Sequence, residues 1–551
     1  MITPDWIEAL LECLHLGGVG AVSPKLIYDN GLIQHAGMVT GVRRLVGTAF
    51  HCLPSDSGEY FNLAQSTREV SLLSGACLAV PADVFREVGG FDAKNTPVAH
   101  SDVDLCLRIR ARGLRCVYTP HATLRHTGHV SIGSVEKAAT KKHKRDKADI
   151  FLLRRWCREI SYDPFFTKHM RDLVYHDSPE DYQIHAPLIA ADPGGMDILL
   201  IAHDLSRSGA PRALVDMART LKEAGNFVVV TSPTDGPHRD TLVGMGVPVI
   251  TDAHVLTGHD TVVDFGKNFD IVIGNTVLSW RDIQRLSQFT RTYLYSLESN
   301  LIPQQFLPLP GFTDAIRGAT GVWSVTERTA RHLRASRDHI DILPNPAAVT
   351  CPIKGDRPPG CGEKVRIVLI GSLESRKGQD IAVEAIMRMS EQHRRQTKLT
   401  MFGRRHDPDF VADLIQKIEG VSGIELGPEL APSDCLKEIR QADIVLLASR
   451  DDTLPLISLD CLALGRVLVC TRETGTSEFL EDGISGFIAE NASSAAIADA
   501  LTRALAQREH WAEIGRRGRE ICERNFTYAI FQKRLLGFIG CPDAAPSLQT
   551  E

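Results

Sequence analysis

Two cations in the last third of the chain have a setting that fits a phosphorylated ligand. Arg376 and Lys377 follow the apolar run 365–371, which ends at Gly371. This run predicts a buried parallel strand, and an amphipathic pattern from Gln379 predicts a helix directly after the cations. Cations beside a helix N-terminus pair with an anion while the free N–H groups donate to it. The pattern therefore predicts a diphosphate site.

Two carboxylates, Asp452 and Asp460, follow with seven residues between them. Asp452 lies in the loop after the predicted strand 442–449, and Asp460 lies within the predicted helix 456–464. Both can face the crevice at the carboxyl ends of parallel strands, where they would accept hydrogen bonds from sugar and ribose hydroxyls. Taken singly, Asp452 is better interpreted as a helix N-cap and Asp460 as a solvated helix residue. Their combination with the cations favours a ligand site.

The stretch 365–486 resembles the C-terminal domain of the family 4 (group 1) retaining glycosyltransferases of GT-B fold. The motifs that carry the resemblance are Arg376–Gln379, Ser449–Asp460, Gly465–Leu468 and Gly475–Glu478. The resemblance implies that Arg376 and Lys377 bind the donor diphosphate and stabilise the leaving group. It also implies that Asp460 binds the ribose and Asp452 the donor sugar. Further donor-binding residues are expected at Gly371, Thr453 and Leu454, the last two at the start of the helix beside Pro455.

This sequence departs from the family pattern at both acidic positions. The family carries Glu there, whereas this chain carries Asp452 and Asp460, so each side chain is one methylene shorter.

The segment 196–350 alternates strand and helix patterns, which predicts a parallel, doubly wound sheet. It resembles the N-terminal, acceptor-side domain of the same family. In the predicted loop 204–212, Gly209 is expected to approach the donor phosphates, with an ordinary tight turn as the alternative. Asn275 is expected to contact a sugar and Glu298 the acceptor side. Leu297 stands where relatives often carry histidine.

Residues 1–175 resemble the back half of the family 2 glycosyltransferases of GT-A fold. The motifs are Gly89–Asp92, Asp102–Arg108 and Tyr118–Ala122. The resemblance implies that Asp102 is the general base and that His126, in a predicted loop over 124–129, is a metal ligand. The opening strand and the Asp-x-Asp motif of that family are missing.

Because a metal-bound diphosphate needs about two ligands beyond its own oxygens, His126 alone does not supply a metal site. A packing module without catalysis is therefore the better interpretation of residues 1–175. Asp102 would then be a carboxylate stabilised by the dipole of its helix. A chain that starts late relative to a longer protein is a further alternative.

Composition bounds the function. The 551 residues carry a net charge of −6, so no global basic field recruits nucleic acid. The 13 cysteines show no zinc spacing and, without a recognisable signal peptide, are expected to be reduced residues of a cytosolic protein. No apolar run of about 18 residues predicts a membrane span. The basic run 141–147 is interpreted as a solvated helix face, with contact to anionic lipid as the alternative.

We therefore predict an α/β protein with two doubly wound, Rossmann-like domains in the GT-B arrangement, preceded by a partial GT-A-like domain. The expected boundaries are a first domain at 1–175, a linker at 176–195, the two GT-B domains at 196–350 and 364–525, and a crossover helix with tail at 526–551.

The resemblance implies retaining transfer from a nucleoside-diphosphate sugar to a glycan or lipid-linked acceptor in surface polysaccharide assembly. No cofactor is expected for the GT-B site, and Mg²⁺ or Mn²⁺ only if the first domain is active. The expected place is the cytoplasm or the inner face of the membrane. Two alternatives stay open: an inverting, metal-dependent transferase that works through Asp102, and a non-catalytic scaffold that binds sugar nucleotides.

Overall fold

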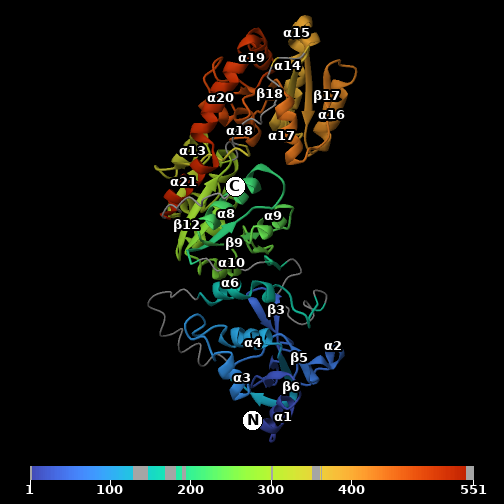
Figure 1. The fold of residues 1–551 in the computed structure, drawn as a ribbon, viewed down its shortest axis with the longest axis vertical. Coiled ribbons are helices and arrows are strands. Elements are labelled where there is room, and N and C mark those ends of the chain that lie inside the picture. Colours follow the sequence, from blue (N-terminus) through green and yellow to red (C-terminus); the bar gives the residue numbers. More distant parts are fainter. Residues whose placement is uncertain are drawn as a thin grey trace. The chain divides into compact units, whose positions relative to one another are not determined.

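The computed structural model describes residues 3–127, 147–167, 170, 182–188, 194–298, 302–349, 360 and 363–541 (Figure 1). Residues 141–146 of the predicted basic run, just over half of the predicted linker 176–195 and the tail beyond Cys541 lie outside the described residues. The chain divides into two compact units. The first comprises Met1–Arg207, Leu221–Gly274 and Arg281–Thr292, and the second comprises Ser208–Thr220, Asn275–Trp280 and Tyr293–Glu551.

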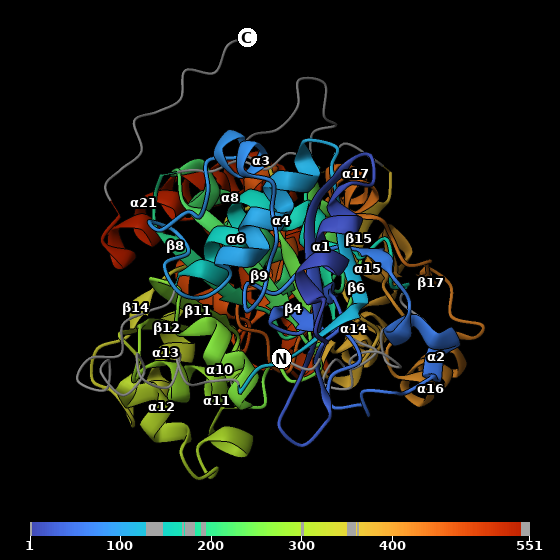
Figure 2. The ribbon, with the colours of Figure 1, turned by 90° about the horizontal axis from the view of Figure 1, so that it is seen from below.

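The first unit opens with a four-stranded sheet in the order β2-β1-β6-β5. Its strands are β1 (Val19–Ile27), β2 (Ile33–His35), β5 (Arg68–Val70) and β6 (Arg115–Arg125). β1 and β6 pair in parallel, and β2 and β5 are antiparallel edges. Helix α1 (Trp6–Leu14) lies against β1 and β6 (Figure 2). β3 (Met38–Val42) and β4 (Leu45–Thr48) form a separate hairpin.

The loop predicted over 124–129 is wrong at its start. β6 continues to Arg125 because Lys25, Leu26 and Ile27 of β1 extend the parallel pairing past Pro120, after a register shift. A sequence window around Pro120 ends the strand, since proline removes a ladder donor. In the structure, pairing with β1 resumes after Pro120 and extends β6 beyond the predicted end.

Helix α4 (Ser101–Ala111) is buried as its excess of apolar residues predicts. Its one fully buried charge, Asp104, accepts hydrogen bonds from Arg108 Nε and Trp156 Nε1, each at 2.8 Å. The indole belongs to α6 (Ala148–Ser161), so this pair fastens α6 to α4. The short helix α3 (Ala82–Glu87) precedes them.

A second, eight-stranded sheet has the order β14-β13-β12-β11-β8-β9-β10-β7. Its strands are β7 (Gln183–His185), β8 (Asp197–Ile201), β9 (Phe227–Ser232), β10 (Val249–Thr251), β11 (Ile271–Asn275), β12 (Arg291–Ser296), β13 (Gly321–Ser324) and β14 (Asp341–Ile342). β7 runs antiparallel to β10, and the pairs β8–β9, β9–β10, β8–β11, β12–β13 and β13–β14 are parallel. Helices α8 (Gly209–Glu223), α9 (His238–Gly244), α10 (Asp260–Gly266), α11 (Trp280–Leu286), α12 (Phe312–Gly318) and α13 (Glu327–Arg334) connect them.

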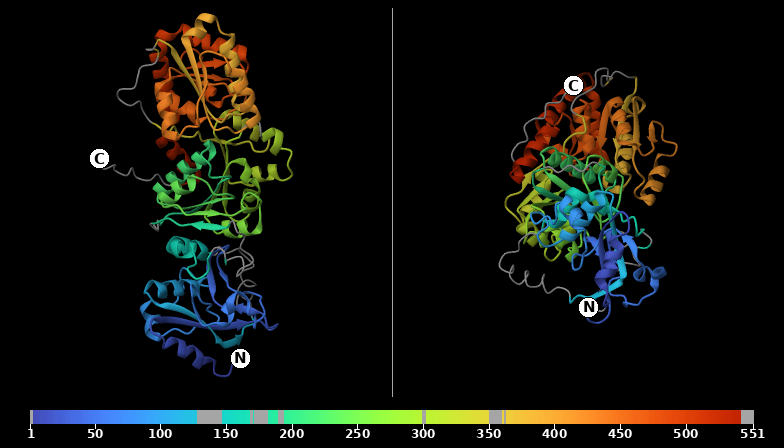
Figure 3. Two further views of the ribbon diagram at one scale, coloured as in Figure 1. Left: turned by 90° about the vertical axis from the view of Figure 1, so that its right-hand side faces the viewer. Right: turned by 60° about the horizontal axis from the view of Figure 1, so that its bottom comes forward.

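The second unit contains a six-stranded parallel sheet in the order β17-β16-β15-β18-β19-β20, flanked by helices on both faces (Figure 3). Its strands are β15 (Val365–Ile370), β16 (Thr397–Phe402), β17 (Ile424–Leu426), β18 (Ile444–Leu447), β19 (Val467–Thr471) and β20 (Phe487–Ala489). Its helices include α14 (Gln379–Arg388), α16 (Pro408–Ile418), α17 (Pro432–Gln441), α18 (Leu456–Ala463), α19 (Ser494–Ala506) and α20 (Trp511–Asn525). The predicted alternation of strand and helix is confirmed.

The last helix, α21 (Tyr528–Ile539), contacts α8 and β13, which precede the six-stranded sheet in the chain. Its Tyr528 hydroxyl lies 3.1 Å from Thr220 Oγ1 of α8, and Phe538 stacks on Trp323 of β13 with 5.9 Å between ring centroids. Within the residues the structure describes, none of the helices is both long and apolar enough to cross a bilayer.

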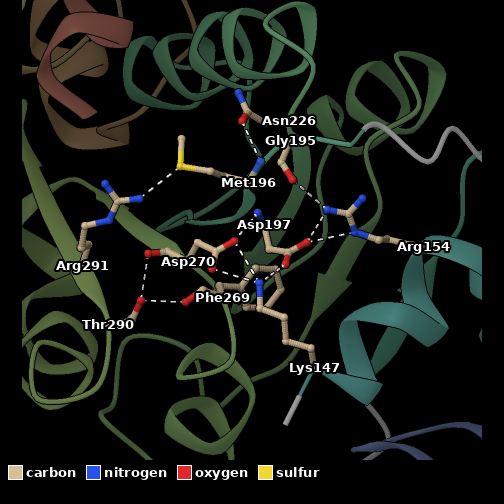
Figure 4. Close-up of polar contacts among 10 residues, drawn as sticks. All are labelled: Lys147, Arg154, Gly195, Met196, Asp197, Asn226, Phe269, Asp270, Thr290 and Arg291. Atoms are coloured by element: carbon tan, nitrogen blue, oxygen red, sulfur yellow. Dashed lines mark hydrogen bonds and ion pairs between the residues drawn. The ribbon is translucent and has the colours of Figure 1, made fainter. Parts of the chain in front are cut away.

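A network of ion pairs ties α6 to the start of two strands in the first unit (Figure 4). The Asp197 carboxylate, at the start of β8, accepts from Lys147 Nζ at 2.7 Å and from two nitrogens of Arg154 at 2.6 and 2.9 Å. Lys147 also binds both oxygens of Asp270, just before β11. The Arg154 guanidinium lies 4.8 Å from the ring centre of Phe227. The network therefore joins the family 2-like part of the chain to the parallel sheet that follows it.

This network predicts a large loss of stability when Asp197 is removed. The carboxylate is only 4% exposed, and Asp197→Ala removes the acceptor of three hydrogen bonds from Lys147 and Arg154, so we expect the free energy of unfolding to fall by about 3 kcal/mol. Asp240→Ala is the control, because its ion pair with Arg239 leaves Asp240 78% exposed and is worth at most about 1 kcal/mol. Denaturant unfolding measures both. Similar losses in the two variants would contradict the assignment.

Candidate functional site

The two predicted phosphate-binding cations lie at the carboxyl end of β15 in the second unit. Arg376 and Lys377 form a single 3-10 turn with Ser375, and α14 begins at Gln379, as predicted. Gly378 between them has φ of 70°, and a Cβ there would stand 2.0 Å from the Ala448 carbonyl oxygen. Only glycine therefore lets this loop approach the end of β18 so closely.

Asp452 is brought into direct contact with Lys377. Its Oδ2 lies 2.5 Å from Lys377 Nζ and accepts from Ser449 Oγ at 3.3 Å, while its Oδ1 is 3.8 Å from Arg376 Nη1. The residue is 7% exposed. The N-cap of α18 is Pro455, so the alternative interpretation of Asp452 as an N-cap is wrong.

Two further cations lie in the loops that follow β15 and β18, Arg376 and Arg450, and each has a carboxylate partner. Arg376 Nη2 donates to Glu374 Oε1 at 2.9 Å. Arg450, which the sequence analysis missed, binds both oxygens of Asp380 at 2.6 and 2.9 Å. Burial raises the pKa of Asp380, but the hydrogen bonds from Arg450 outweigh it and hold that pKa below its usual value. The position of Arg450 inside the Ser449–Asp460 motif was the available signal.

Asp460 is buried in α18 rather than solvated, which makes that alternative wrong as well. Its Oδ1 accepts from the Ala348 backbone N–H at 2.7 Å, and the residue is 6% exposed. Burial raises the pKa of Asp460 to about 6, partly opposed by the Ala348 hydrogen bond and the charge of Arg212. The carboxylate thus holds the segment after β14 against α18.

Thr453 and Leu454 lie beside Asp452, at the entry to α18. Thr453 Oγ1 donates to the Leu297 carbonyl at 2.9 Å, and Leu454 is buried. The nearby Glu478 accepts from the Glu327 backbone N–H at 3.1 Å, at the N-terminus of α13. The motif loops of the six-stranded sheet therefore touch residues that follow β12 and β13.

Gly209 and Asn275, the two predicted donor-binding residues that precede β12 in the chain, lie close to the start of α8. α8 begins at Gly209, four residues earlier than predicted, so the loop 204–212 is shorter and Gly209 lies in its first turn. Asn275 Nδ2 donates to the Ala210 carbonyl at 2.9 Å, and its Oδ1 is buried with no hydrogen-bond partner in the described structure. Thr276 follows with φ of 106°, a strained conformation for a β-branched residue.

Glu298 is half-buried behind Leu297. Its Oε2 accepts from the backbone N–H groups of Leu297 at 3.0 Å and Val277 at 3.2 Å. Burial raises the pKa of Glu298 to about 7, in spite of these hydrogen bonds. A carboxyl with this pKa can both accept and donate a proton near neutral pH.

The two candidates of the first unit have different surroundings. Asp102 Oδ2 accepts from the Gly75 N–H at 2.7 Å and Oδ1 from the Val103 N–H at 2.9 Å. His126 Nδ1 lies 2.7 Å from Gln34 Oε1. Over the ranges that the structure describes, no three His, Cys, Asp or Glu side chains come together as metal ligands. The assignment of His126 as a metal ligand stays a prediction.

Three family models match consecutive parts of the chain. Residues 359–521 match "Glycosyl transferases group 1", residues 194–295 match "Glycosyl-transferase family 4", and residues 53–148 match "Glycosyltransferase like family 2". The chain carries a group 1/family 4 glycosyltransferase region after a family 2-like region. The predicted family resemblance is confirmed.

A solved structure supports the fold of the group 1/family 4 region. Anabaena Alr3699/HepE, crystallised with UDP and glucose, aligns with a TM-score of 0.55 and 16% identity over 63% of this chain and all of that one. The predicted GT-B arrangement is therefore confirmed for this part of the chain.

Two curated relatives match shorter segments. An uncharacterised protein y4gI of Sinorhizobium fredii is 34% identical over 170 residues, which are 31% of this chain and 19% of that protein. The O-antigen biosynthesis protein RfbC of Myxococcus xanthus is 32% identical over 175 residues, 31% of this chain and 13% of that protein. The chain thus spans less than a fifth of the length of either of these two relatives.

The buried carboxyl of Asp460 predicts a pH-dependent stability. Because the pKa of Asp460 rises from 3.8 to about 6 on folding, the folded protein binds this proton more tightly than the unfolded chain does. The stability that the bound proton contributes is lost as pH rises from 4 to 6. Asp460→Asn keeps an oxygen for the Ala348 N–H but cannot ionise. We expect the stability of this variant relative to wild type to increase by about 2 kcal/mol between pH 4 and pH 7.

Denaturant unfolding at the two pH values measures this difference. Asp434→Asn is the control, since that carboxylate is 45% exposed and forms an ion pair with Lys437 on α17. An equal pH effect in both variants would contradict the burial argument.

Proposed function

We propose that the group 1/family 4 region transfers a sugar from a nucleoside-diphosphate donor, with retention, to a glycan or lipid-linked acceptor in surface polysaccharide assembly. The observation that carries the proposal is the meeting of Arg376, Lys377 and Asp452 at the carboxyl ends of β15 and β18. Ligands of open parallel sheets bind at this edge. The likeness to the O-antigen biosynthesis protein of Myxococcus xanthus supports the setting.

The proposed roles follow from charge and reach. Arg376 and Lys377 stabilise the negative charge that develops on the leaving diphosphate, next to the N-terminus of α14. Gly371 leaves room beside the Lys377 side chain, whose Cδ would stand 3.6 Å from a Cβ at that position. Gly209, in the first turn of α8, leaves the helix N-terminus open toward an anion. Thr453 and Leu454 line the entry to α18.

Asp460 departs from the simple ribose-binding role. One of its oxygens already accepts from Ala348, so a ribose hydroxyl would bind Oδ2 or share Oδ1. On the acceptor side, Glu298 supplies a carboxyl with a pKa of about 7, and on the donor side Asn275 supplies a buried amide oxygen. Both groups suit hydroxyl recognition. The acceptor hydroxyl would attack on the face of the leaving group, and a donor phosphate oxygen would take its proton.

This proposal needs no protein nucleophile and no metal, because the cations carry the charge of the leaving group. The cytoplasmic location implied by the family belongs to the same proposal. An inverting reaction at Asp102 would instead require a divalent metal and would be blocked by EDTA. The linkage of the product, α or β, separates the two reactions, and a scaffold would give no product with any donor.

The sharpest test is the replacement of Lys377. Lys377→Ala removes the cation that contacts Asp452 at the end of β18, so we expect loss of diphosphate binding and a fall in kcat/KM of at least about 100-fold. Lys398→Ala is the matched control, because this lysine of β16 is 44% exposed and pairs with Glu425. Product formation is followed by mass spectrometry with a panel of donors.

The same assay distinguishes the two glycosyltransferase-like regions. Asp102→Ala should leave transfer intact, since Asp102 lies in the family 2-like region. Activity that survives Lys377→Ala but disappears in Asp102→Ala would overturn the assignment of the working region.

A further inference from the structure

The proposed diphosphate site is already neutralised by the protein's own charges. Three cations stand on its two loops, and each faces a carboxylate. Arg376 pairs with Glu374 at 2.9 Å, Lys377 with Asp452 at 2.5 Å, and Arg450 with Asp380 at 2.6 Å. A donor diphosphate carries negative charge of its own, so its binding requires at least one of these carboxylates to give up its cation.

Asp452 is the carboxylate best placed to be exchanged. Its Oδ2 contacts Lys377, and its Oδ1 lies 3.8 Å from Arg376, so it faces both cations that the proposed function assigns to the diphosphate. Glu374 contacts Arg376 within its own loop, and Asp380 is held by Arg450 through two hydrogen bonds. Asp452 therefore stands where a phosphate oxygen would have to go.

The Asp452 backbone is fixed while its carboxylate is held by side chains. Its N–H donates to the Glu473 carbonyl at 3.2 Å, and its carbonyl accepts from the Gly475 N–H at 2.8 Å. The carboxylate contacts come from Lys377, Ser449 and Arg376, all through side-chain atoms. A rotation of the side chain would thus release Lys377 without unfolding the loop.

We propose that Asp452 is an internal counter-anion of the diphosphate site, which the donor diphosphate displaces from Lys377. This inference rests on the proposed function and deepens it. The exchange moves no covalent bond. Displacement frees the Asp452 carboxylate to accept a hydroxyl of the donor sugar, so the charge that opposes diphosphate binding then orients the sugar.

The proposal predicts that removal of the Asp452 charge strengthens binding of a bare diphosphate. In the full-length chain, Asp452→Asn should bind inorganic pyrophosphate about tenfold more tightly than wild type. Transfer of sugar should fall in the same variant, since the amide lacks the carboxylate for the hydroxyl. A residue that only supports the fold, or only binds the sugar, would not raise pyrophosphate affinity. Calorimetric titration measures the dissociation constant.

Three further variants make the test specific. Asp380→Asn removes a carboxylate of the same loops that pairs with Arg450, so it controls for a general change in charge and should bind pyrophosphate less than about threefold more tightly. Asp452→Glu keeps the charge and should stay within about threefold of wild type. Asp452→Ala lacks the charge as well. If the Asn variant does not fold, the pyrophosphate affinity of the Ala variant takes its place in the test, and the same increase is expected.

The outcomes separate this inference from the proposed function. Pyrophosphate binding that is lost in Lys377→Ala but unchanged or weakened in Asp452→Asn overturns the counter-anion and leaves the proposed function standing. An equal gain in Asp380→Asn also overturns it, because the effect would then be one of overall charge. Binding that is insensitive to Lys377→Ala overturns the diphosphate site itself.

Discussion

The proposed diphosphate site depends on the close approach of two loops at the carboxyl ends of β15 and β18. The Arg450 N–H donates to the Arg376 carbonyl at 2.8 Å, and Gly378 stands against the Ala448 carbonyl where no side chain fits. This backbone contact brings Lys377 and Asp452 together, although 75 positions separate them. Opposite charges held this close by backbone contacts lose little conformational freedom when they pair.

The same constraint explains why Asp serves at a position where the family has Glu. With the loops in contact, the shorter Asp452 side chain still reaches Lys377 Nζ at 2.5 Å. A longer side chain could extend past the Lys377 ammonium toward a ligand, whereas the Asp452 carboxylate ends at that ammonium. The departure from the family pattern therefore keeps a carboxylate at this position, in direct contact with Lys377.

Local patterns in the sequence predicted much of the fold and the cationic half of the site. The run 365–371 and the start of α14 follow from apolar periodicity and helix-start rules, and both lie where predicted. The errors come from partners distant in the sequence. β6 continues past Pro120 because β1 extends the pairing, and the Asp460 partner, Ala348, lies 112 positions away. Arg450 was missed since a single arginine in a loop gives no periodic signal.

The contacts of the motif loops carry the synthesis one step further. Thr453 binds the Leu297 carbonyl, Glu478 caps α13 at Glu327, and Asp460 holds the Ala348 N–H. In all three hydrogen bonds the partner of the motif side chain is a backbone group: a carbonyl at Leu297 and N–H groups at Glu327 and Ala348. Such groups are present whatever the side chain at those positions. The motif side chains thus act on the position of neighbouring backbone rather than on particular side chains. The loop that presents Asp452 is thus linked by one hydrogen bond to Leu297, the residue next to the Glu298 proposed for the acceptor side.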